Sequence, residues 1–517
     1  MRWKIIVAIS LLAMISASPV FAENGSGMIK IGYTFIDEEG NRAVNHSTFN
    51  QYEGFDFSLE KFRYFLKNGI RFDADLKRVT LNNRNLYFGA EKSGLFGVRV
   101  NNNQYRRVYD FDGNDFIRRH TTTGDIWLYP YRYVKIFASG SFIGRSGSVL
   151  EYFDVVDGGV PTAVDYEQKR ANTGFQINYR GRMLRAEYGG INYVNHEDYY
   201  LDQSRRWFKI RGFGAVPRYD WILIHGGFLN YRTWYKQTDF EIKSNKGWGG
   251  TTLNLPMNFS VSYNFIFERT ASDSDKVGTD NIAHTFYASH LWPGYAGATI
   301  GYQNDISDDF DNVIKANSYY FSGWIKPKSY LDFRAEYGFR AEKVDEGSRL
   351  LGDEDRNRFK ISGKYRHDRY GSIRIRYEIR TRNNDQLGSE VDFDRVAFDW
   401  VFLISEYADL TGGYSYSVGD YTNTEQEFEF RDHLVYGDIL SHEYYNVQAG
   451  TGLVYYRSKR DTDVESIALH FSGRYKLPDS YYFEVKYNVN NFDNFLVNNE
   501  YYTANIVEIN LTKDLSF

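Results

Sequence analysis

The residue types that carry catalysis or bind metals are present in this sequence, but their spacing does not match the patterns that such chemistry needs. Ten His residues are scattered over 517 positions. His284 and His290 are close in sequence, but neither belongs to a His-Glu-x-x-His pair that would hold zinc. There is no Gly-x-Ser-x-Gly nucleophile elbow, and no carboxylate and His residues stand out as a catalytic set. We therefore expect no catalytic residue and no enzyme activity.

The absence of Cys narrows the chemistry further. Without Cys there is no thiol nucleophile, no disulfide and no Cys-x-x-Cys-His site, so the chain cannot attach a c-type haem to itself. Carboxylates at alternate positions, such as Asp273 and Asp275, would suit calcium, but no stretch has the full calcium-loop spacing. We interpret the acid-rich stretches as solvated loops, with no metal or cofactor site in this chain. These stretches are residues 271–280, 305–312, 345–357 and 421–430.

Charged residues do follow a pattern, because they alternate with apolar ones. After Pro327, for example, Leu331, Phe333 and Ala335 alternate with charged residues. A period of two indicates β-strands with two different faces. Charge on a lipid-facing strand position costs roughly 2–4 kcal/mol for Arg or Lys at the bilayer midplane, so we expect the charged face to line a lumen. The lumen-facing candidates are Asp332, Arg334, Glu336, Arg340, Arg374, Arg376, Glu378, Arg380, Glu484 and Lys486.

The end of the chain shows the same alternation. Leu511, Leu515 and Phe517 share one face of the last segment, and the residues between them are polar. A soluble protein rarely ends on an apolar strand, because termini usually fray. Barrels of the bacterial outer membrane commonly end on an aromatic residue that their assembly machinery reads. We expect these three residues to be the barrel-assembly signal; an ordinary edge strand is the alternative.

The start of the chain and its composition favour the same fold class. Residues 1–22 have the basic start, short apolar core and small-residue exit of a secretory signal peptide. Removing Arg2 and Lys4 with it changes the formal charge from −5 to −7, which gives no sign of nucleic-acid binding. The 45 Tyr and 39 Phe in a chain of mean hydropathy −0.54 suit a membrane barrel with aromatic girdles. Residues 23–517 are then one barrel in the outer membrane, surrounded by its lipid.

Turn signals give the expected number of strands. Six of the eight Pro residues precede an aromatic residue within strand-like sequence, where they mark tight turns, while Pro161 is expected in a loop. With six further Gly- or polar-rich turns, the count is 12 short turns and about 26 antiparallel strands, within a range of 22 to 28. The least certain strand is 426–439. The short turns are expected in the periplasm and long loops outside the cell.

The width of such a barrel bears on its function. Twenty-six tilted strands close at a diameter of roughly 50 Å. Porins for passive diffusion need only 16–18 strands, so a wider barrel needs something to fill it. The mixed charges of the expected lumen suit a wet contact with another protein.

The size, the signal peptide, the Tyr content and the strand number resemble the MtrB/PioB outer-membrane barrels. The early stretch 32–40, which leads to Tyr52-Glu53-Gly54-Phe55, is part of this resemblance. It implies a barrel that sheathes a periplasmic multihaem c-type cytochrome and insulates electron transfer across the outer membrane. The haem would belong to the partner, and the barrel would have no catalytic residue. The Cys pair found near the N-terminus of some members is absent here.

Two functions therefore remain open. One is a scaffold for a cytochrome conduit that serves extracellular electron transfer. The other is a large outer-membrane porin or channel for the uptake or export of solutes.

Overall fold

The computed structural model describes residues 25–516 apart from ten short gaps. The gaps are 45–49, 110–112, 152–159, 273–277, 310–311, 347–352, 385, 405, 425 and 498–499. The expected signal peptide and Phe517 lie outside the described residues. None of the described helices has the length and hydropathy needed to cross a bilayer.

The described elements are 26 strands and three single-turn 3-10 helices. The strands are β1 (Gly25–Gly40), β2 (Gly54–Phe65), β3 (Ile70–Lys77), β4 (Asn85–Lys92), β5 (Phe96–Val108), β6 (Phe116–Tyr131), β7 (Val134–Glu151), β8 (Val160–Tyr179), β9 (Arg182–Asn195), β10 (Gln203–Val216), β11 (Tyr219–Tyr235), β12 (Phe240–Leu255), β13 (Phe259–Ser272), β14 (Gly278–Trp292), β15 (Ala296–Asp309), β16 (Asn312–Lys328), β17 (Leu331–Glu346), β18 (Glu354–His367), β19 (Gly371–Asn384), β20 (Ser389–Leu403), β21 (Ala408–Thr422), β22 (Glu427–Ser441), β23 (Val447–Arg460), β24 (Val464–Leu477), β25 (Tyr481–Asn494) and β26 (Tyr501–Ser516). The helices are η1 (Tyr199–Leu201), η2 (Pro256–Asn258) and η3 (Pro478–Ser480).

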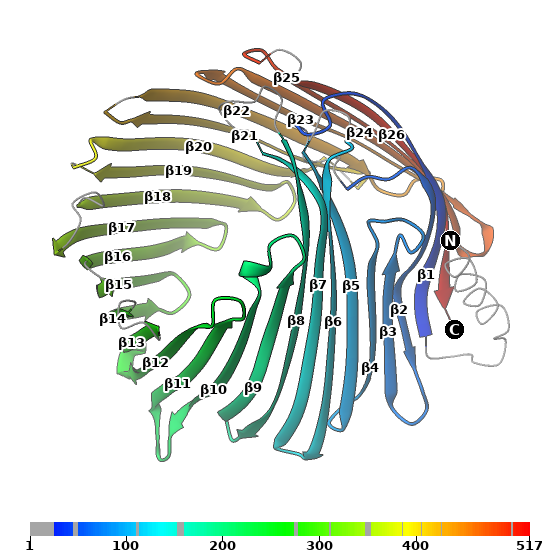
Figure 1. The fold of residues 1–517 in the computed structure, drawn as a ribbon. Coiled ribbons are helices and arrows are strands. Elements are labelled where there is room, and N and C mark those ends of the chain that lie inside the picture. Colours follow the sequence, from blue (N-terminus) through cyan, green and yellow to red (C-terminus); the bar gives the residue numbers. More distant parts are fainter. Residues whose placement is uncertain are drawn as a thin grey trace.

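The sheet closes on itself. Each strand pairs antiparallel with its neighbours in the chain, and β1 pairs with β26 from Ser26 opposite Ser516 to Gly40 opposite Tyr502. Figure 1 shows the strands as the wall of a barrel, with β1 beside β26. Closure leaves no unpaired sheet edge, which is what a β-structure needs inside a bilayer. The expected all-β, antiparallel up-and-down barrel of 26 strands is confirmed.

One face of this wall is apolar and exposed. On β13 this face carries Phe259, Phe265 and Phe267, each more than one-third exposed, and then Arg269 nearer the other end of the strand. On β19 it carries Ile373, Ile375, Tyr377 and Ile379. An apolar band about ten residues long is what crosses a bilayer at the strand tilt of a barrel. We call this the lipid face, and we call the opposite face the inner face.

The turns lie where the sequence predicts them, with some differences in strand extent. Short turns separate all 12 expected strand pairs, and the uncertain strand at 426–439 is present as β22. Pro161 was placed wrongly, because it is the second residue of β8 and not part of a loop; Pro is tolerated near the start of a strand. The stretch 305–312 is mostly strand as well, since β15 and β16 pair as far as Asp309 opposite Asn312.

Buried side chains are concentrated where β26 meets β1. Tyr502, Ala504 and Ile506 of β26 form one cluster, packed against Ile36 and other partly buried residues. Tyr502 is only 1% exposed, and its hydroxyl donates a hydrogen bond to Glu38 Oε2 at 2.8 Å. This cluster joins the first strand to the last, so closure has a packed core in addition to its hydrogen bonds.

The expected assembly-signal residues differ in exposure. Leu511 is 44% exposed on the lipid face, whereas Leu515 is buried against Leu59 and Ala74. Their role in assembly remains a prediction.

Candidate functional site: a basic inner wall

The expected lumen residues fall into two groups on the inner face. Eight of the ten lie on β17 and β19, which are separated by β18. Glu484 and Lys486 lie on β25 as a pair 3.3 Å apart. The structure therefore brings most of the candidates together in one region of the wall, although their contact with a water-filled lumen remains a proposal.

The strand register places these residues in rows. In an antiparallel pair, directly opposed residues share a face, with their Cβ atoms about 5 Å apart. One row runs across Asp332, Lys364 and Arg374, and another across Arg340, Arg356 and Arg382. Between residues 354–364 and 374–382, the inner faces of β18 and β19 present eight cations against Glu354 and Glu378. This is a strong local excess of positive charge in a chain whose net charge is −5.

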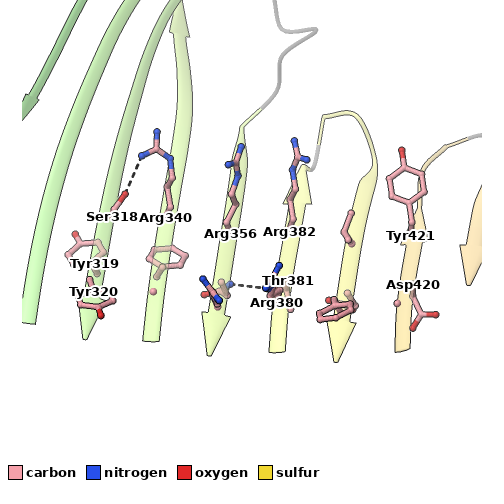
Figure 2. Close-up of a pocket in the computed structure, with 18 of the residues that line it drawn as sticks. Ser318, Tyr319, Tyr320, Arg340, Arg356, Arg380, Thr381, Arg382, Asp420 and Tyr421 are labelled. Carbon is pink, nitrogen blue, oxygen red and sulfur yellow. Dashed lines mark hydrogen bonds between the residues drawn. The ribbon is translucent and has the colours of Figure 1, made fainter. Parts of the chain in front are cut away.

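The row of three arginines lines a groove of 650 Å³. Figure 2 shows the side chains of Arg340, Arg356 and Arg382 pointing the same way from adjacent strands. Arg340 Nη1 donates to Ser318 Oγ at 3.3 Å and to Asp305 Oδ2 at 2.7 Å. Aromatic side chains of the inner face complete the groove, and Arg380 lies over one of them, Phe393, at 5.5 Å from the ring centre.

Shared carboxylates hold these arginines beside one another. Glu354, 6% exposed, accepts from Arg356 and also from Arg382 Nη2, the latter at 2.6 Å. Glu378 does the same for Arg358 at 2.9 Å and Arg380 at 2.6 Å. Since like charges directly opposed across strands repel, each carboxylate offsets the repulsion of two neighbours.

A second, fully polar hollow of 190 Å³ lies nearer the short turns. Two of its cations are neutralised within the wall. Arg334 pairs with Asp332 at 3.1 Å, and Arg376 pairs with Asp399 at 2.8 Å. Its other lining residues are Glu336, Lys360, Ser362, Lys364 and Arg374.

Sequence reasoning missed the contribution of β18. The lumen-facing candidates were taken from strands that follow a tight turn, whereas β18 precedes one. The signal was present, because Arg356, Arg358, Lys360, Ser362 and Lys364 alternate with mostly uncharged residues in the same way.

The His residues singled out from the sequence form no metal site in the part of the chain that the structure describes. There, no group of three or more His, Asp or Glu side chains is placed to hold a metal ion. His284 lies on the lipid face, with its Nδ1 2.9 Å from the Tyr263 hydroxyl. His290 packs edge-on against Trp292, with ring centres 4.2 Å apart.

Comparison with known proteins supports the fold. No protein-family model and no curated protein matches the chain. The FrpB iron transporter from Neisseria meningitidis is similar over 96% of this chain and 82% of its own, with 10% identity and a TM-score of 0.52. The siderophore receptor PirA from Pseudomonas aeruginosa is similar over 81% and 80%, with 10% identity and a TM-score of 0.51. A variant of the ferric enterobactin receptor PfeA, also from Pseudomonas aeruginosa, covers 96% and 80% at 8% identity and a TM-score of 0.51.

These similarities extend to the barrel and no further. The resemblance to the MtrB/PioB barrels has no support from these comparisons beyond the shared architecture, and none of them points to a cytochrome partner. The closed 26-stranded wall, its exposed apolar belt and these structural neighbours make the chain a β-barrel of the bacterial outer membrane.

Proposed function

We propose that the chain is a wide channel that carries polar solutes across the outer membrane. The observation that supports this most is the two-faced wall. Its 26 strands close without a break, with apolar side chains on one face and an ionised network on the other. Because charged groups at membrane depth need water or partners, the inner face is suited to line an aqueous passage.

The described residues are consistent with an open interior. Apart from η1, η2 and η3, every described element is a strand of the wall, so no separate folded domain of this part of the chain fills the barrel. At roughly 50 Å across the backbone, the barrel is wider than the 16–18-stranded porins that already conduct water and ions.

Single-channel recording in planar lipid bilayers tests this proposal. A lumen of this width is expected to give ohmic steps larger than those of 16–18-stranded porins under the same conditions. Exclusion of polyethylene glycols of increasing size then measures the lumen. Purified, correctly folded barrel that gives no conductance would refute the channel.

A second function is favoured by the same width. A barrel with no described domain of its own in the lumen can sheathe a partner protein, and the resemblance noted above suggests a multihaem c-type cytochrome. The inner wall carries charges of both signs, as a polar contact with a protein would require. A c-haem absorbance band that co-purifies with the barrel and abolishes its conductance would favour the sheath over the channel.

A further inference from the structure

We infer that the hollow between β17, β18 and β19 is a binding site for free inorganic phosphate, as the hydrogen phosphate dianion. This rests on the proposed function, since it names the class of solute that the channel would bind. Three cations of the hollow form no ion pair within the wall.

The side chains of Lys360, Lys364 and Arg374 form no hydrogen bond or ion pair with the described residues, whereas Arg334 and Arg376 in the same hollow are paired. Nearby on the inner face, Arg340, Arg358 and Arg382 each contact a carboxylate within the wall. Lys364 and Arg374 are directly opposed, so their Cβ atoms are about 5 Å apart. Asp332 is opposed to Lys364 and Asp399 to Arg374 on their outer sides, but these carboxylates pair with Arg334 and Arg376. An anion bound between Lys364 and Arg374 would offset their repulsion.

The hollow offers a matching set of groups around this pair. Ser362 lies between the two lysines along β18 and lines the same hollow, where its hydroxyl can donate to an oxyanion. Arginine offers two parallel N–H donors that fit phosphate oxygens, and lysine adds point charge. A hollow of 190 Å³ accommodates a phosphate-sized ion but not a folded protein segment.

Glu336 distinguishes between oxyanions. It lines the hollow, is opposed to Lys360 and forms no ion pair with a cation among the described residues, so its carboxylate is placed to accept a hydrogen bond from a ligand. Hydrogen phosphate carries one O–H to donate, whereas sulfate carries none. Asp332 and Asp399 already neutralise Arg334 and Arg376. The three remaining cations of the hollow and the one carboxylate of Glu336 then sum to a charge of about +2, which matches the hydrogen phosphate dianion.

Equilibrium dialysis of the folded full-length barrel in detergent, with radiolabelled inorganic phosphate at constant ionic strength, tests the site. We expect saturable binding, at least about tenfold tighter than that of sulfate. The double variant K364Q/R374Q should weaken phosphate binding about tenfold or more, because it removes two charge-assisted contacts. It should fold at least as well as the parent chain, because it relieves repulsion; the single variant S362A, with a smaller loss, gives a second measure.

The control variant K135Q/K209Q removes the same number of inner-face cations on β7 and β10, where both lie over Trp rings away from the hollow. It should bind phosphate as the parent does. The variant E336Q should reduce the preference for phosphate over sulfate. Absence of saturable binding by the parent, equal losses in the two double variants, or an unchanged preference in E336Q would each overturn the assignment. Because dialysis needs no conductance, these outcomes are independent of whether the barrel forms a channel.

Discussion

Replacing Ile375 by Arg should destabilise the barrel strongly, because Ile375 lies near the middle of the lipid face of β19 and is 53% exposed there. Its chain neighbours Arg374 and Arg376 belong to the inner face, so the same strand tolerates Arg one position away. Arg at the bilayer midplane of a barrel costs about 2–4 kcal/mol, whereas the cost near the interfaces is about 0–1 kcal/mol. At about 1.4 kcal/mol per factor of ten, I375R should lower the folding equilibrium constant roughly 30- to 700-fold.

The assay is guanidinium unfolding of the barrel in lipid vesicles, followed by tryptophan fluorescence and by the gel mobility of the folded form. The matched control is S139R, which adds the same side chain to the inner face of β7, opposite Asp125. We expect S139R to stay within about 1 kcal/mol of the parent, as a lumen substitution should. If both variants lost the same free energy of unfolding, the assignment of the two faces would be wrong.

Three further predictions concern closure, the arginine row and pH. The variant Y502A should cost about 3–5 kcal/mol of stability, since Tyr502 is buried in the cluster that joins β26 to β1. The variant Y502F should lose only about 1 kcal/mol, because it removes only the hydrogen bond to Glu38. Equal guanidinium midpoints for the two variants would contradict this. The variant E354Q should cost about 1–3 kcal/mol, because Arg356 and Arg382 are then opposed without their shared carboxylate. An unchanged midpoint would show that this pair of arginines needs no such offset. The pKa of His442, in the turn after β22, is raised by hydrogen bonding to the Glu406 carbonyl and by Asp409. The contacts of protonated His442 with these two residues of the neighbouring turn are therefore present in full below pH about 6.5, and they are lost as pH rises through the raised pKa. Protease cleavage in that turn should therefore increase with pH in the parent and not in H442Q, and a pH-independent cleavage rate in the parent would refute the link.

Much of the fold could be predicted because a barrel strand needs only local information. Alternation identifies a strand and its two faces, and tight turns at positions such as Pro217 and Pro478 set the spacing, so the count of 26 strands follows from the sequence. Pro161 was misplaced because the sequence shows which residues can start a strand but not how far the hairpin continues.

The candidate site could be predicted only in part, because register is not local. The sequence indicates that Arg374 and Arg376 share a face, but not that Lys364 is opposed to Arg374 while Asp399 pairs with Arg376. Register depends on turn geometry and on pairing along the whole hairpin, and a shift of one residue would exchange the two faces. The proposed phosphate site depends on which cations are paired and which are not, and only the structure shows this.

The central claim is that alternate residues of one wall contact water and lipid. Thiol labelling of adjacent positions on β18 tests this claim most directly. The parent chain has no Cys, so I361C and S362C each introduce a single thiol, the first on the lipid face and the second on the inner face. In proteoliposomes, a membrane-impermeant maleimide should label S362C rapidly and leave I361C unreacted. Equal labelling of the two positions, or faster labelling of I361C, would contradict the account.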